Sequence, residues 1–97
     1  MVEKIRVGAI DYNIDYINLS TRMDDENGKS MGFCIFEENL IEVNNSMDIE
    51  RQKQTIIHEM VHAMFFEMGL EDDEDVVNRL GIVLHQVLKD NDFSWVK

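Results

Sequence analysis

The chain has 97 residues, enough for one domain with a single modest core but too few for a separate substrate-binding lobe. Its formal net charge of -11 argues against direct binding to nucleic acid or to an anionic membrane surface. One cysteine, Cys34, cannot form an internal disulfide, and no long apolar run follows a basic start, so we expect a cytoplasmic protein.

Two β-hairpins are predicted in the first half of the chain, because charged or polar residues alternate there with aliphatic and aromatic ones. The predicted strands cover residues 2–7, 12–17, 31–36 and 40–43. Gly8 and Ala9 break the first pair, and Glu37-Glu38-Asn39 turns the second. An exposed polar loop at 21–30 separates the hairpins. We expect the four segments to form a small antiparallel sheet.

From Met47 the apolar residues recur with a period of 3.6, which predicts a helix that ends at Gly69. The candidates for its N-cap are Asn45, Ser46 and Asp48. Its predicted core stripe consists of Ile57, Val61, Met64 and Met68. His58 and His62 lie side by side on the adjoining flank, so the helix can pack on the sheet and still present both imidazoles.

A second helix is predicted to open in the acidic run 71–75, where negative charge complements the helix dipole, and to end at 90–92. Its predicted apolar face consists of Val76, Val77, Leu80, Val83, Leu84, Val87 and Leu88. Phe93 and Trp95 are expected to fold back onto the domain, with an exposed partner-binding tail as the alternative. The predicted fold is therefore α+β: a small sheet, then two packed helices, in one domain over residues 1–97.

The segment His58-Glu59-Met60-Val61-His62 is an H-E-x-x-H motif, which on a helix places two imidazoles one turn apart on a single face. Apolar residues surround this pair, and a bound metal would account for both rings in such surroundings. An open zinc site uses three protein ligands and leaves the fourth position to water. We therefore predict Zn²⁺ on His58 and His62, with Glu59 as the general base of a peptide hydrolysis.

The third ligand is predicted in or just before the second helix. Glu74 is the first choice, because it shares one helix face with Asn78 at i+4. In a plain antiparallel helix pair, however, Glu74 would lie roughly 9 Å along the axis from the level of His62, at 1.5 Å per residue. His85 would then be better placed. The remaining alternatives near the end of the first helix are Glu71, Asp72, Asp73, Asp75 and Asn78.

The segment 55–63, followed by Glu74-x-x-Val77-Asn78-x-Leu80, resembles the ImmA/IrrE-like metallopeptidases, in a minimal form of phage or mobile-element type. These enzymes belong to a broader gluzincin-like group. The resemblance covers about residues 40 to 91. The chain differs from the larger relatives in the short interval between His62 and Glu74, in Val77 where they usually have alanine, and in lacking a second domain.

The resemblance implies a zincin-like core with zinc bound by His58, His62 and Glu74, and with Glu59 as the catalytic base. It also implies regulatory cleavage of a protein, often a transcriptional repressor. The leading hypothesis is thus a zinc metallopeptidase that holds an extended peptide along an edge strand near 33–36 or 40–43.

Two alternatives to this hypothesis are a zinc-binding module without turnover and an acidic inhibitor or DNA mimic that acts through its surface charge. Cys34 is a weak candidate for a nucleophile. Because it alternates with Phe33 and Ile35, we predict a small core residue.

Overall fold

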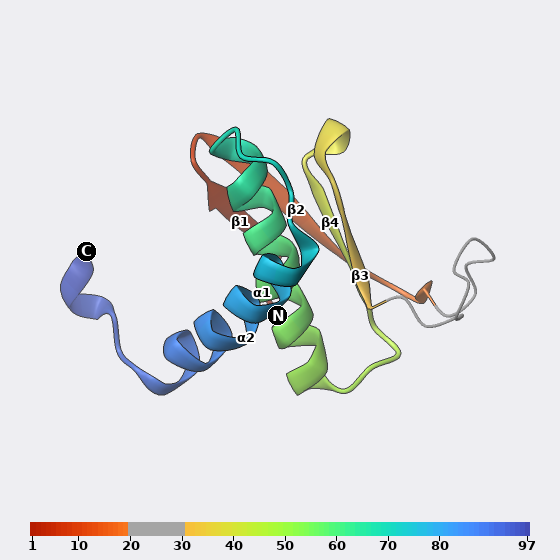
Figure 1. Cartoon of the computed structure of the whole chain (residues 1–97). Coiled ribbons are helices and arrows are strands. Elements are labelled where there is room, and N and C mark those ends of the chain that lie inside the picture. Colours follow the sequence, from red (N-terminus) through yellow and green to blue (C-terminus); the bar gives the residue numbers. More distant parts are fainter. Residues whose placement is uncertain (20–30) are drawn as a thin grey trace.

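The computed structural model describes residues 1–19 and 31–97, so the loop predicted at 21–30 lies outside the described residues. Four strands form one sheet and two helices follow it (Figure 1). The strands are β1 (Lys4–Val7), β2 (Ile10–Ile17), β3 (Gly32–Ile35) and β4 (Leu40–Asn44), and the helices are α1 (Ile49–Glu67) and α2 (Glu74–Asp90). Short 3-10 turns occur at η2 (Phe36–Glu38) and η3 (Ser94–Val96). The predicted α+β class is confirmed.

Both predicted hairpins are present, but they join through a parallel pair of strands. β1 runs antiparallel to β2 and β3 antiparallel to β4, whereas β2 and β4 are parallel, with Ile14 opposite Ile41. The sheet, in the order β1-β2-β4-β3, is therefore mixed rather than purely antiparallel as predicted. Alternation of apolar residues indicates which face of a strand is buried, but it carries no information about which strand lies alongside.

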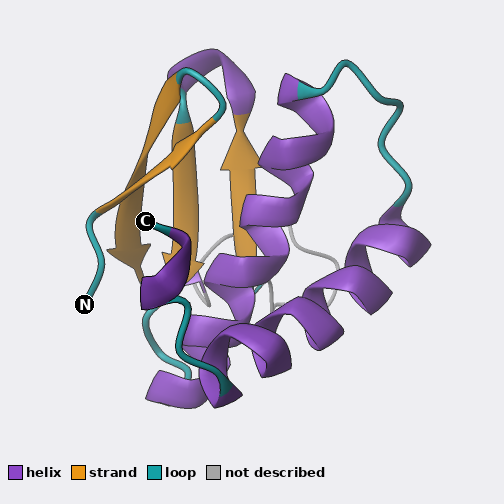
Figure 2. Cartoon of the chain, turned by 90° about the vertical axis from the view of Figure 1, so that its left-hand side faces the viewer, coloured by secondary structure: helices purple, strands orange, loops and turns teal. Residues whose placement is uncertain are grey.

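The core lies between the sheet and α1, which packs across one face of the strands (Figure 2). Its buried residues are Val7, Tyr12, Ile14, Ile41, Val43, Ile56 and Ala63. The Tyr12 hydroxyl donates a hydrogen bond of 2.6 Å to the Glu67 carboxylate, which ties β2 to the last turn of α1. Burial, followed by this hydrogen bond, raises the pKa of Tyr12, so the hydroxyl remains a donor.

Both ends of α1 follow from local sequence. Asp48 is the N-cap among the three candidates, and its carboxylate accepts a hydrogen bond of 2.8 Å from the Arg51 amide. At the other end Gly69 adopts a positive φ of 71°, and the amides of Gly69 and Leu70 donate to the carbonyls of Phe66 and Phe65. This is the Schellman arrangement, so the predicted glycine stop is confirmed.

The buried stripe of α1 differs from the predicted one. Val61 is fully buried as predicted, but Met68 is 58% exposed and Ile57 is only partly buried. The buried residues are Gln52, Thr55, Ile56, Glu59, Val61, His62 and Ala63. Because α1 is apolar around much of its circumference, its periodicity does not distinguish the face toward the sheet from the face toward α2. Glu59 and His62 consequently lie on the buried side of the helix.

α2 crosses α1 steeply instead of running back along it (Figure 2). Its N-cap is Asp73, whose carboxylate accepts hydrogen bonds from the amides of Asp75 and Val76. The helices approach closely at Gly81, where an added Cβ would lie 3.5 Å from the Cα of His58. This crossing brings the first turn of α2 toward the two histidines.

Much of the predicted apolar face of α2 is exposed. Val77 is fully buried, whereas Val76, Leu80, Val83 and Leu88 are each more than 40% exposed. The expected fold-back of the segment after α2 was wrong for Trp95, which is 76% exposed. No helix within residues 1–19 and 31–97 combines the length and the apolar character that a membrane crossing requires.

Candidate metal centre

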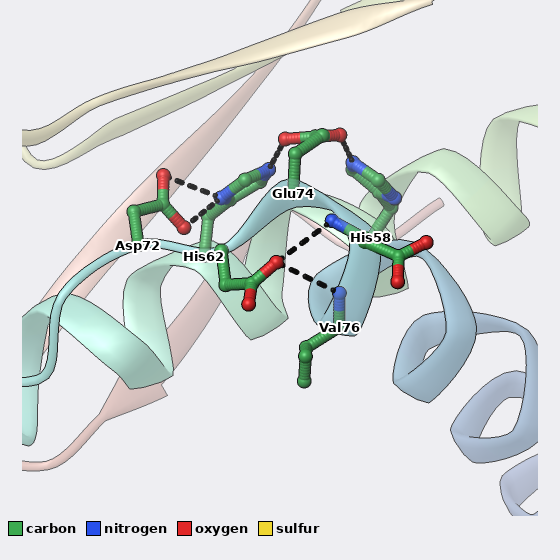
Figure 3. Close-up of polar contacts among 7 residues, drawn as sticks. His58, His62, Asp72, Glu74 and Val76 are labelled. Atoms are coloured by element: carbon green, nitrogen blue, oxygen red, sulfur yellow. Dashed lines mark hydrogen bonds and ion pairs between the residues drawn. The ribbon is translucent and has the colours of Figure 1, made fainter.

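The structure brings together the three side chains predicted as metal ligands (Figure 3). His58 Nε2 lies 3.0 Å from one carboxylate oxygen of Glu74, and His62 Nε2 lies 2.9 Å from the other. The two rings are 5.0 Å apart between centroids and inclined by 70°. One ligand atom from each residue lies within 4.8 Å of the others, so this group could hold a metal ion.

One local feature and one tertiary feature place these ligands. The helical spacing of four residues puts His58 and His62 on neighbouring turns of α1. Glu74 is the first residue of α2, and the steep crossing carries that residue over both imidazoles. The objection to Glu74 assumed a plain antiparallel helix pair, which the structure does not contain. His85 instead lines a separate hollow with Ile57 and Leu88, away from the histidine pair.

The geometry and chemistry of this group fit zinc. Two imidazole nitrogens and one carboxylate form a ligand set that open zinc sites use. Tetrahedral zinc with bonds near 2.1 Å holds neighbouring ligand atoms roughly 3.4 Å apart, and one ligand atom from each of the three residues lies within 4.8 Å of the others, so small side-chain shifts would close them around one ion. The Glu74 side chain is 71% exposed, so a fourth position would open to solvent.

Asp72 contacts the far side of the His62 ring. Its two carboxylate oxygens lie 2.8 and 3.0 Å from Nδ1, while Nε2 faces Glu74 (Figure 3). A neutral imidazole has one N–H, so donation from Nδ1 to Asp72 leaves the Nε2 lone pair facing a carboxylate oxygen. A cation between Nε2 and Glu74 would stabilise that arrangement. Asp72, one of the aspartates considered as a metal ligand, is thus placed to orient His62 instead of binding the ion itself.

The role of Asp72 can be measured as zinc affinity. We expect Asp72→Asn to weaken zinc binding by roughly 10- to 100-fold, the usual effect of losing a partner that orients a metal-bound histidine. Glu71→Gln is the matched control, because it removes one charge from the neighbouring exposed position. Competition with a chromophoric chelator gives both affinities. Equal affinities of the two variants would contradict an orienting role for Asp72.

Glu59 is the buried acid of the site, with only 7% of its surface exposed. Burial raises its pKa to about 7, and the carboxylates of Glu74 and Asp72 act in the same direction, while His62 acts against them. A carboxylate with a pKa near neutrality can both accept and return a proton at physiological pH. Its environment therefore suits the predicted general base.

A hollow of about 510 Å³ contains the three candidate ligands and Glu59. Its other walls come from β3 with the residues on either side of it, from α1 and from α2, and include Met31, Gly32, Phe33, Cys34, Phe36, Arg51, Gln54, Thr55, Asn78 and Ile82. β3 is an edge of the sheet as described, whereas β4 pairs with β2 and β3 and lies inside it. Of the two predicted peptide-binding strands, only β3 is thus an edge beside the site.

Cys34 also lines this hollow. The side chain is partly buried and packs against the core, as predicted. Burial raises the pKa of its thiol to about 12, with Glu59 as the largest electrostatic contributor. The thiol therefore stays protonated at neutral pH, which makes it a poor nucleophile.

Gly32 was not singled out from the sequence, yet it sits against the buried acid. A Cβ at this position would lie 2.7 Å from both the carbonyl oxygen of Glu42 and the Cγ2 of Thr55, and 3.5 Å from the Cγ of Glu59. The absence of a side chain lets β3 approach α1 at the site. No local pattern in the sequence marks such a contact, because its atoms come from distant segments.

We expect Gly32→Ala to destabilise the fold by about 1–3 kcal/mol, the usual cost of forcing an extra methyl group into tight packing. Gly81→Ala is a matched control: its Cβ would meet His58 at an ordinary contact distance of 3.5 Å, and alanine favours a helix. Urea unfolding of both variants measures the difference. A Gly32→Ala variant as stable as Gly81→Ala would contradict the tight approach of β3 to α1.

Comparison of the chain with protein-family models, with curated proteins and with solved structures finds no match. The resemblance to ImmA/IrrE-like metallopeptidases therefore depends on the sequence motif alone. The function has to be argued from the geometry of the site.

Proposed function

We propose that the protein is a cytoplasmic zinc metallopeptidase that hydrolyses a peptide bond in a specific, regulatory protein substrate. The observation that carries this proposal is the meeting of two Nε2 atoms with one carboxylate, beside a buried glutamate with a raised pKa. This combination supports hydrolysis rather than storage of a metal, because a purely structural zinc site is closed by four protein ligands.

His58, His62 and Glu74 would hold the ion, and Asp72 would orient His62. When bound, zinc lowers the pKa of a coordinated water toward about 7 and polarises a substrate carbonyl. Glu59 would accept a proton from the attacking water and then donate it to the leaving amine. Its burial supports this role, since a fully solvated glutamate would be too weak a base.

The substrate would bind as an extended segment along β3. An edge strand can add a peptide through main-chain hydrogen bonds, and the four residues of β3 span roughly 13 Å at 3.3 Å per residue. Phe33, Phe36 and Ile82 line the same hollow and offer apolar contacts to the substrate's side chains. A transcriptional repressor is the substrate class that the motif resemblance suggests.

Metal titration tests the centre itself. We expect metal-stripped protein to take up one zinc per chain, His58→Ala to lose this uptake, and His85→Ala to retain it. The His85 variant is the matched control, because that imidazole lies in a different hollow. Absence of stoichiometric uptake by the unaltered protein would refute the metal centre.

Cleavage is tested separately with a library of peptides derived from a bacterial proteome. New N-termini identified by mass spectrometry in the presence of zinc, and absent with Glu59→Gln, would support peptidase activity. Stoichiometric zinc uptake without any new N-terminus would refute the peptidase and favour the zinc-binding module without turnover.

A further inference from the structure

A second hollow, of about 580 Å³, lies between β1, the start of α1 and the end of α2. Its apolar wall consists of Met1, Val2, Ile5, Ile56, Ile57 and Leu88. Its polar residues are Glu50, Lys53, His85 and Lys89. None of these residues lines the hollow that holds the candidate metal centre. The two hollows are thus separate features of the molecule.

The segment Phe93–Val96, here called the aromatic segment, is ordered but exposed. The Asn91 side chain donates to the Val87 carbonyl at 3.0 Å, and the Ser94 amide donates to the Asp92 carboxylate at 2.9 Å. These bonds order the exit from α2, and the segment projects away from the sheet and helices (Figure 1). Trp95 is 76% exposed, which leaves a large apolar ring uncovered.

The charges near the two features are complementary. Lys53 and Lys89 flank the hollow and share the carboxylate of Glu50, at 3.5 and 3.7 Å respectively. Asp90 and Asp92 lie within three residues before the aromatic segment, and Lys97 follows it. In a chain with a net charge of -11, two copies repel each other unless acidic parts of one meet basic parts of the other. The lysines at the second hollow could contact the aspartates that precede the aromatic segment of another copy.

We propose that the aromatic segment of one protomer occupies the second hollow of another copy of this chain. Each chain carries one segment and one hollow, so a reciprocal exchange fills both in a closed dimer with two-fold symmetry. The 76% exposure of Trp95 in its own chain favours this exchange over insertion into the same chain. Neither the metal nor the cleavage reaction takes part.

Tryptophan fluorescence tests the proposal directly, because Trp95 is the only tryptophan in the chain. As the protein concentration rises, we expect the emission maximum of Trp95 to shift to shorter wavelength. Sedimentation velocity over the same concentrations should show the monomer converting to a dimer. Trp95→Ala should stay monomeric over the same range. Met68→Ala is the matched control, since Met68 is a comparably exposed apolar residue outside both features.

A mixing experiment distinguishes the contact between segment and hollow from nonspecific association. Leu88→Glu places a charge in the hollow at a position that is 43% exposed, so the fold should tolerate it. Each of Trp95→Ala and Leu88→Glu alone should be monomeric. Their mixture should form a heterodimer, because Leu88→Glu supplies an intact segment and Trp95→Ala an intact hollow.

Three outcomes would overturn the proposal. Trp95 emission typical of water at every concentration would show that the segment stays uncovered. A short-wavelength emission that is independent of concentration in a monomer would place the segment in its own chain. A dimer that survives Trp95→Ala would place the contact elsewhere.

Discussion

Glu59→Gln should lower kcat/KM for peptide cleavage by roughly 10²- to 10⁴-fold, the range that general acid–base catalysis contributes, while zinc affinity stays nearly unchanged. Glutamine keeps the shape of Glu59 but cannot accept the proton of the attacking water. Kinetics on a cleaved library peptide, together with zinc competition, separate the two effects. A parallel loss of zinc in this variant would indicate that Glu59 holds the ion or its ligands and is not only a base.

The same substitution should stabilise the metal-free protein above pH 7. Burial raises the pKa of Glu59 from its ordinary 4.5 to about 7, so the folded state binds more protons than the unfolded state between these values. The free energy of unfolding therefore falls as pH rises through this window, by about 3 kcal/mol in total, and stays reduced above it. The Glu59→Gln variant has no carboxyl group to ionise here, so its free energy of unfolding should not fall in this way. Urea unfolding of the unaltered protein and of the variant at pH 5 and pH 8 measures the difference. An equal pH dependence of the two proteins would contradict a buried, ionisable Glu59.

Glu74→Ala should weaken zinc binding by more than the roughly 100-fold upper limit for losing an orienting partner, because it removes a direct ligand. Zinc at 100 times its dissociation constant stabilises a folded protein by about 2.7 kcal/mol, and that gain should disappear in this variant. Calorimetric titration and thermal unfolding with zinc measure these effects.

Asp75→Ala is the matched control for Glu74→Ala. Both residues are acids in the first turn of α2, so both substitutions remove the same interaction with the helix dipole. Asp75 forms an exposed ion pair with Arg79 at 3.3 Å and contacts neither histidine in the structure as described. Undiminished zinc affinity in Glu74→Ala would remove Glu74 from the candidate centre and leave the third ligand unassigned.

The histidine pair and the ends of α1 could be predicted because they depend on local sequence. A spacing of four residues places His58 and His62 on one face of any α-helix. Asp48 and Gly69 cap α1 through bonds within a few residues of the chain. Hydrophobic alternation likewise indicated the hairpins, and the change of period indicated the helices.

Only the tertiary structure showed which strands, helices and side chains contact one another. The choice of Glu74 over His85 depended on the crossing of α2 over α1, and the parallel pairing of β2 with β4 depended on how two hairpins pack. The fit of Gly32 against Thr55 and the exposure of Trp95 likewise involve surfaces that no short segment contains. The physical reason is that periodicity reports which face of an element is apolar, whereas crossing angles and strand neighbours follow from packing between residues far apart in the chain.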